Sequence, residues 1–485
     1  MCIRDSNDTY VNFDGITYAK GASVLKQLVY YVGREKFFQG INQYLNKYAY
    51  SNATLADLLH ELEKASGRDL KAWSAKWLEE SGINTIATEV EENADGTIAS
   101  LTLNQTAPAE HPVLRPHRLA VGFYDEDPAT GKIVRTDRFE LDVDGESTVV
   151  AAAAGKKRPA FILVNDDDLT YTKLRFDADS LSFALANLQR FDDALARAVV
   201  WLSLWDMTRD GDLAAEKFID TTLALLATET ESTTFRYALS CMSTTAWHYT
   251  APDRRADVVK HVAKELWKLV IAAPGGSDQQ FQLVTAYLGY GEEGDAEFAE
   301  HAQGLFDGSL IVAGLEIDNN FTWTIINALS SVKLIDQAGI DAQLAKRDTT
   351  ENREFALGAH AVRGDAAAKE WAWNEALNNA DLTNMQLEAV ARGFGATPRP
   401  DLAEPYAAKY YDVVDWVWKN KSFHMAEALL EGLYPYYADP ATLVELGHRW
   451  LADHEDADNA LKRIVRGNVE SSQRTLKVRD FNAAL

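Results

Sequence analysis

The sequence predicts a multidomain, mainly α-helical protein in which a β-sandwich separates two helical regions. The chain has 485 residues, more than one ordinary hydrophobic core accommodates. Apolar residues recur at helical spacing in residues 10–82 and again from about residue 177. Between these regions apolar and polar residues alternate, as in half-buried strands. We therefore expect three domains, at residues 1–82, 83–175 and 176–485.

The first region is predicted to contain a series of short helices. One of them has apolar residues at Ala22, Val24, Leu25, Leu28, Val29 and Val32. Gly33 is expected to end this helix. Another helix is expected to begin with Asn52 or Thr54 as its N-cap. An amphipathic stripe of tryptophans comes next and ends at Gly82.

The middle region carries the signals of a small antiparallel β-sandwich. The alternating apolar residues are Leu119, Val121 and Phe123, then Phe139, Leu141 and Val143. Residues 161–164 form a short, continuously apolar run. Turn sequences rich in Asp, Asn and Gly separate these segments, which is typical of strands joined by tight turns.

The last region, residues 176–485, is predicted to be a large α-helical domain. Apolar segments at helical spacing succeed one another with brief Gly, Asp or Asn breaks. Consecutive helices with short connections favour stacked helical hairpins, which form a curved α-solenoid. No fixed repeat length is evident, so the repeats are expected to be irregular.

Composition excludes several classes of partner. The formal net charge is −25, which repels nucleic acid phosphates and anionic lipids. Cys2 and Cys241 are the only cysteines, so we expect no disulfide framework and a cytoplasmic protein. No run of about 18 apolar residues is present, so no membrane span is expected. Residues 1–6 fit poorly with the residues after them and are interpreted as an artefactual junction.

The sequence contains no recognisable metal site. No two of the ten histidines lie four residues apart, so no helix presents a His pair of the H-E-x-x-H type. His60-Glu61 is followed by Lys64 where the second ligand would be. Residues 166–168 are three consecutive aspartates that could take calcium, but we interpret them as a turn that ends a strand. We therefore expect this chain to bind no metal.

Tyr18 is the one candidate catalytic residue. It precedes Lys20-Gly21 and the first apolar-periodic segment, which places its phenol at the start of a helix. A neutral phenol, with a pKa of about 10, can donate a hydrogen bond to a developing oxyanion. Such a donor is useful opposite a metal that polarises the same carbonyl. Spacing alone, however, favours the alternative that the ring packs at a domain edge.

The segment Asp14-x-Ile16-x-Tyr18-x-Lys20-Gly21-Ala22 resembles the one that follows the zinc site in the aminopeptidase N family of gluzincin metallopeptidases. The resemblance continues through residues 31–38 to the turn at residues 82–84. Residues 163–171, 198–210 and 369–373 are similar to the actinobacterial-type members. In the family, the end of a thermolysin-like catalytic domain precedes a β-sandwich and a large helical domain. The resemblance therefore implies that residues 1–82 are the C-terminal helical portion of the catalytic domain.

The resemblance also implies a function. Tyr18 matches the family tyrosine that hydrogen-bonds the tetrahedral intermediate, whereas the zinc-binding motif and the segment that holds the substrate amino terminus do not occur here. We expect the C-terminal portion of a monomeric zinc aminopeptidase that removes residues from peptide N-termini. This chain alone is expected to be inactive and zinc-free. The alternatives are a helical-solenoid module that binds peptides or proteins without catalysis, and a non-enzymatic scaffold.

Cutting a catalytic domain also has an expected structural consequence. The apolar face of the first helix, including Leu25, Leu28 and Val29, is expected to lack its partners. The first 80 residues are then less stable than the remainder.

Overall fold

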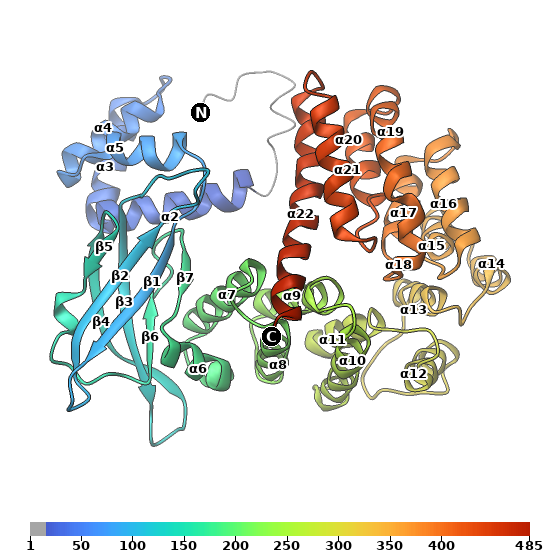
Figure 1. Cartoon of the computed structure of the whole chain (residues 1–485), viewed down its shortest axis with the longest axis horizontal. Coiled ribbons are helices and arrows are strands. Elements are labelled where there is room, and N and C mark those ends of the chain that lie inside the picture. Colours follow the sequence, from blue (N-terminus) through green and yellow to red (C-terminus); the bar gives the residue numbers. More distant parts are fainter. Residues whose placement is uncertain (1–15) are drawn as a thin grey trace. The chain divides into compact units, whose positions relative to one another are not determined.

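The computed structural model describes residues 16–485 (Figure 1). It divides into two compact units, one reaching to Met207 and one running from Thr208 to Leu485. Helices dominate both units, and the strands all lie in the first one. The predicted fold class, a mainly α-helical protein with an intervening β-sandwich, is confirmed. The boundaries at residues 82 and 175 remain predictions.

The first unit begins with short helices around a compact core. They are η1 (Ile16–Lys20), α2 (Gly21–Val32), α3 (Arg34–Lys47), α4 (Leu55–Ser66), α5 (Leu70–Ser74) and η2 (Ala75–Glu79). Gly33 ends α2 with a φ of 91°, a backbone conformation that favours glycine. Thr54, not Asn52, is the N-cap of α4, and it forms a capping box with Asp57.

The core of these helices corrects one expectation. The buried side chains are Val24, Leu28, Val32, Leu59, Leu62, Leu70, Trp73 and Trp77. Leu28 is only 3% exposed, so the prediction that it lacks partners is wrong. Leu25 is 56% exposed, as expected of an unpartnered residue. The face of α2 that packs is therefore the one carrying Val24, Leu28 and Val32.

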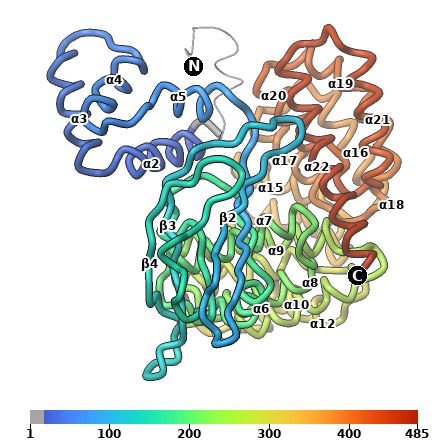
Figure 2. Tube along the Cα trace, turned by 60° about the vertical axis from the view of Figure 1, so that its left-hand side comes forward, coloured from blue at the N-terminus to red at the C-terminus, as the bar shows by residue number. Residues whose placement is uncertain are grey.

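The strands form two sheets that make up the sandwich (Figure 1). They are β1 (Thr85–Glu92), β2 (Ile98–Thr106), β3 (His117–Glu126), β4 (Ile133–Val143), β5 (Ser147–Val149), β6 (Phe161–Val164) and β7 (Lys173–Arg175). One sheet has the order β5-β2-β1-β7 and the other β4-β3-β6. β3 and β4 pair along their whole length, and they run side by side in Figure 2.

The sheets are not entirely antiparallel. β7 pairs parallel to β1, with Thr85 opposite Lys173, which differs from the predicted antiparallel sandwich. The reason is the path of the chain, because β6 ends in one sheet and residues 165–172 carry the chain to the edge of the other sheet. This connecting segment passes the first helices, and the candidate site depends on it.

Helices occupy the rest of the chain. The strands are followed by α6 (Ala178–Asn187) and α7 (Ala194–Asp210), and then by α8 (Ala215–Leu226), α9 (Ser232–Thr244), η5 (Thr245–Tyr249), α10 (Arg255–Ala272), α11 (Asp278–Leu288), α12 (Ala296–Asp307), α13 (Asn319–Ser331), α14 (Gln337–Lys346), α15 (Thr350–Ala361), α16 (Ala366–Asn378), α17 (Asn384–Gly395), α18 (Pro400–Ala403), η6 (Glu404–Tyr406), α19 (Ala407–Asn420), α20 (Phe423–Gly432), α21 (Pro440–Asp453) and α22 (Asn459–Ala483). None of the helices within residues 16–485 is long and apolar enough to cross a membrane.

Packing in the second unit relies on close helix contacts. α15 packs on α17, and α17 packs on α20. Glycines make the approach possible, because a Cβ on Gly393 would lie 2.6 Å from the carbonyl oxygen of Gly358. The long helix α22 packs on α21 and η5. Near its end, the Asn482 side chain accepts a hydrogen bond of 2.8 Å from the backbone N–H of Ala215, the first residue of α8.

Candidate functional site

Tyr18 lies in η1, a single π-helical turn that continues into α2 without a break. Lys20, between the two, has helical dihedral angles of −65° and −42°. The Tyr18 side chain is 65% exposed, so it does not pack in the core of this unit. π-Helical turns are uncommon and are found frequently at functional sites. The structure thus presents the phenol at the start of a helix, where a substrate could meet it.

The buried face of α2 anchors this helix to the core. Val24, Leu28 and Val32 are buried against the tryptophans of α5 and η2. Full burial of an aliphatic side chain of this size contributes about 1.5–3 kcal/mol. The hydrophobic effect is non-directional, whereas hydrogen bonds depend on distance and angle. The polar contacts of α2 therefore add directional constraints on its position.

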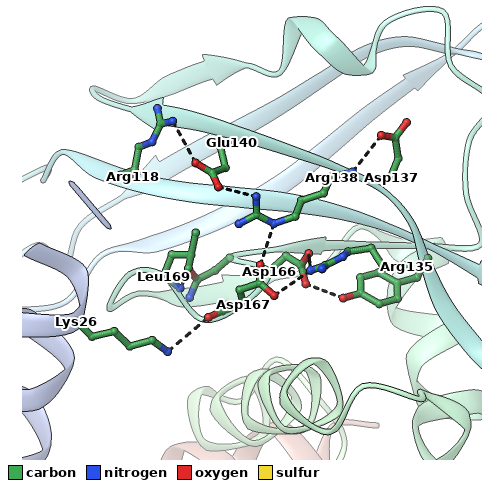
Figure 3. A network of polar contacts seen from close by, with 11 residues as sticks. Lys26, Arg118, Arg135, Asp137, Arg138, Glu140, Asp166, Asp167 and Leu169 are labelled. Carbon is green, nitrogen blue, oxygen red and sulfur yellow. Dashed lines mark hydrogen bonds and ion pairs between the residues drawn. The ribbon is translucent and has the colours of Figure 1, made fainter. Parts of the chain in front are cut away.

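Two adjacent residues of α2 make polar contacts with residues 165–171, which we call the acidic loop. The Lys26 ammonium lies 2.8 Å from the Asp168 carboxylate. The Gln27 Oε1 atom accepts a hydrogen bond of 2.9 Å from the Thr170 hydroxyl and another of 2.9 Å from the Tyr171 N–H. Figure 3 shows the Lys26 side chain extending from α2 toward the loop. The acidic loop thus connects α2 with the sandwich.

The acidic loop has an unusual backbone that its own side chains hold. Asn165, Asp167 and Asp168 have positive φ angles of 59°, 66° and 54°. Asn and Asp tolerate this left-handed region better than other non-glycine residues. The Asn165 side chain accepts from the N–H groups of Leu169 and Thr170, and donates to the Thr170 carbonyl. These bonds place the Thr170 side chain against α2.

Arginines of β4 hold the aspartates of the loop (Figure 3). Asp166 is 1% exposed, and it accepts from Arg135 at 2.7 Å and from the Tyr124 hydroxyl at 2.6 Å. Arg138 Nε donates to Asp167 at 2.8 Å. Burial, together with the hydrogen bond to Asp166, raises the pKa of the Tyr124 phenol. The three aspartates thus form the expected turn directly after β6, and their carboxylates are paired with cations.

Zinc does not fit the residues that the structure describes. Within residues 16–485, no three His, Cys, Asp or Glu side chains are grouped as a metal site requires. His117 is fully buried and His248 is half-buried, and burial lowers the pKa of each to about 3. Both ring nitrogens of His117 contact protein side chains, those of Thr170 and Gln105, so this histidine supports the fold and has no nitrogen left for a metal.

The residues that fix α2 leave no signal in the sequence. Gln27, Thr170, His117 and Gln105 belong to four separate elements or loops, and the spacing between them carries no motif. Tyr18, by contrast, is identifiable from its position before the first helix. Its role in chemistry remains a proposal.

Comparisons with known proteins identify the family. Residues 161–474 match the model of the ERAP1-like C-terminal domain, and residues 1–77 match the Peptidase family M1 domain. The chain belongs to the M1 family of aminopeptidases, as the resemblance of its sequence predicted. The helical region that follows the sandwich is thus the C-terminal domain characteristic of this family.

Several curated relatives are aminopeptidases. Aminopeptidase N of Streptomyces lividans is 39% identical over 488 residues, which cover 99% of this chain and 56% of that protein. Aminopeptidase 2, mitochondrial, of Saccharomyces cerevisiae is 32% identical over 194 residues, or 37% of this chain and 19% of that protein. Probable aminopeptidase 1 of Sulfurisphaera tokodaii is 38% identical over 89 residues, 18% of this chain and 11% of that protein. The chain thus spans little more than half the length of the Streptomyces protein.

Proposed function

We propose that this chain is the C-terminal portion of a zinc-dependent aminopeptidase that removes residues from the N-termini of peptides. Family membership and the 39% identity to an aminopeptidase N over 99% of the chain support the reaction class. The observation that carries the proposal is the exposed phenol of Tyr18 at the start of α2. Peptides are the proposed substrates, and zinc is the proposed cofactor of the complete protein.

Tyr18 is proposed to stabilise the tetrahedral intermediate. In peptide hydrolysis, the oxygen of water bonds to the carbonyl carbon, and the carbonyl oxygen becomes an oxyanion. The water gives up a proton as it bonds, the C–N bond then breaks as the carbonyl re-forms, and the leaving amine takes up that proton. The Tyr18 O–H donates a hydrogen bond to the oxyanion and keeps its own proton throughout. A donor of this kind is worth about 10²–10³ in kcat.

The test is Tyr18→Phe in the complete aminopeptidase that contains this chain. We expect kcat to fall about 10²-fold or more, while the free energy of unfolding stays unchanged, because the ring is exposed. An unchanged kcat would refute the catalytic role. It would favour the alternative that the chain is a peptide- or protein-binding helical module with a degenerate N-terminal region.

We further propose that the 485-residue chain by itself is inactive and binds no zinc, since its sequence has no H-E-x-x-H pair. Metal analysis of the purified chain, together with an aminoacyl-arylamide assay, tests this point. Stoichiometric zinc or measurable turnover would contradict it.

The complete protein is also proposed to be a cytoplasmic monomer. The net charge of −25 is the reason to propose that neither nucleic acid nor anionic membranes are partners. Retention on immobilised DNA at physiological salt would contradict the first part of this proposal.

A further inference from the structure

We propose that Thr170 and Gln27 are positioning residues for Tyr18, and that their hydrogen bond fixes the helix on which the phenol is carried. This inference rests on the proposed function of Tyr18. It assigns a role in the reaction to a contact between two side chains that are 143 residues apart in the sequence.

Gln27 is placed to control the position of Tyr18. The two residues are nine positions apart in one continuous helical segment, which corresponds to about 14 Å along the helix axis. A helix of this length transmits a shift at one end to the other, because its backbone hydrogen bonds keep it rigid. A displacement of α2 at Gln27 therefore displaces the phenol.

The hydrogen bonds of the Gln27 side chain fix the position of α2 more than they stabilise the fold. Its side chain is 1% exposed, and both hydrogen bonds go to Oε1, whereas the buried Nε2 has no hydrogen-bond partner within residues 16–485. The side-chain amide cannot be flipped, since the donor Nε2 would then face the Tyr171 N–H, which is also a donor. An apolar residue of the same size would avoid the cost of an unpaired buried donor. The glutamine is explained by its two acceptor bonds.

Lys26 adds a second point of attachment. Successive helical residues point about 100° apart, so Lys26 and Gln27 meet the acidic loop from different directions. The Lys26–Asp168 ion pair lies on the half-exposed edge, and the Gln27–Thr170 bond lies inside. Together they restrict both rotation of α2 and sliding along its axis.

Thr170 is itself held by the sandwich. Its Oγ1 lies 2.8 Å from Nδ1 of His117, which begins β3. Nε2 of His117 lies 3.0 Å from Oε1 of Gln105, which belongs to β2 in the other sheet. A row of three polar contacts thus runs from β2 through β3 and the acidic loop to α2.

The hydrogens in this row are too few for all three contacts. Oε1 of Gln105 is fixed as an acceptor, because it also accepts from the Arg115 N–H and because its Nε2 donates to the Gly145 carbonyl. Oε1 of Gln27 is fixed likewise by the Tyr171 N–H. Neutral His117 and the Thr170 hydroxyl supply one hydrogen each for three contacts. With the proton of His117 on Nδ1, the imidazole donates to Thr170 and the Thr170 hydroxyl donates to Gln27, and the contact with Gln105 lacks a hydrogen. With the proton on Nε2, the Thr170 hydroxyl has to serve either His117 or Gln27, so the Nδ1 tautomer is the one that supports both contacts of Thr170.

The experiment is a double-mutant cycle in the complete aminopeptidase that contains this chain. Thr170→Val keeps the shape of the side chain and removes the hydroxyl, and Thr170→Ser keeps the hydroxyl. We measure kcat and KM for an aminoacyl-arylamide with each variant, alone and combined with Tyr18→Phe. We expect Thr170→Val to lower kcat about tenfold and to change KM less than about twofold, as a small misplacement of a catalytic group does. Thr170→Ser is expected to restore kcat.

The combination with Tyr18→Phe is the decisive measurement. If Thr170 acts through the phenol, Thr170→Val causes no further loss of kcat once Tyr18→Phe is present. An equal loss in both backgrounds, or no loss in either, would overturn the inference. If Tyr18→Phe alone leaves kcat unchanged, the proposed function has failed, and the positioning role fails with it. The two failures are therefore distinguishable.

Two further variants guard against effects on folding. Gln27→Met keeps the size of the side chain and removes both acceptor bonds, so it is expected to repeat the result of Thr170→Val if that variant unfolds. Thr172→Val is the matched control, since the Thr172 hydroxyl donates to the Asn84 carbonyl at 2.9 Å and not to a residue of α2. We expect its kcat to be unchanged. A loss of kcat with Thr172→Val equal to that with Thr170→Val would count against the inference.

Discussion

The Lys369 ammonium lies 2.7 Å from the carbonyl oxygen of Ala361, the last residue of α15. The same nitrogen contacts the carbonyl oxygens of Gly393 and Phe394 near the end of α17, at 3.2 and 3.1 Å. A single buried side chain of α16 thus satisfies the C-terminal carbonyls of two neighbouring helices, where the helix dipoles favour a cation.

This arrangement predicts a pH-dependent stability. Burial lowers the pKa of Lys369 from 10.5 to about 7. Between these two values the unfolded chain binds more protons than the folded one, so the free energy of unfolding rises with pH, by up to about 1.4 kcal/mol per unit. Urea unfolding at several pH values between 7 and 10 measures the slope. Lys369→Met is the reference, because other titrating groups affect both proteins equally, and identical slopes would contradict the prediction.

Gly393→Ala is expected to destabilise the second unit. The added Cβ would lie 2.6 Å from the Gly358 carbonyl oxygen and 2.8 Å from the Ala361 Cβ. Forcing an extra methyl group into such a contact costs about 1–3 kcal/mol. The midpoint of thermal unfolding should fall. Gly467→Ala in α22 is the control, since its Cβ would meet nothing within 4 Å in the described part of the chain, and there we expect no loss or a small gain.

Thr54→Ala is expected to weaken the start of α4. The Thr54 hydroxyl accepts from the Asp57 N–H, and the Asp57 carboxylate accepts from the Thr54 N–H. Loss of an N-cap of this type costs about 1 kcal/mol. The measurement is the free energy of unfolding in denaturant, followed by a signal from the first unit. Asn52→Ala, at the other residue that the sequence offered as a cap, should have no effect, and equal losses for both variants would argue against the capping box.

Arg135→Met is expected to be strongly destabilising. It would remove the cation that lies 2.7 Å from Asp166, a carboxylate with an exposure of only 1%. Leaving a buried charge unpaired costs about 3 kcal/mol or more. Lys132→Met is the control for an exposed ion pair. The Lys132–Asp192 pair is more than half exposed, and such pairs contribute at most about 1 kcal/mol. Similar losses in the two variants would show that burial of Asp166 is unimportant.

The sequence predicted the elements better than their partners. Helical spacing located α2 and α4, because the spacing of apolar residues depends on local geometry. It also assigned Leu25 to the apolar face, and it provided no reason to place Gln27 there. The acidic loop, 143 residues further along, gives Gln27 its contacts, and a tertiary contact of this kind leaves no periodic signal.

The strand pairing and the candidate site show the same limit. The parallel pair of β7 with β1 arises from the path of the chain between the sheets, which alternation of residues does not reveal. Tyr18 could be identified because its neighbours in sequence resemble a family motif. Thr170 and His117 could not, since their relation to the phenol exists only in three dimensions.

The bond between Asn482 and Ala215 makes the second unit differ from an open solenoid. In an open solenoid each repeat contacts only its neighbours, so the array can assemble from one end while the chain is still being synthesised. Here the first helix of the unit lacks one of its partners until residue 482 is available. The Ala215 N–H therefore gains this acceptor only after residue 482 has been synthesised, and removal of the last residues of α22 would take it away from the start of α8.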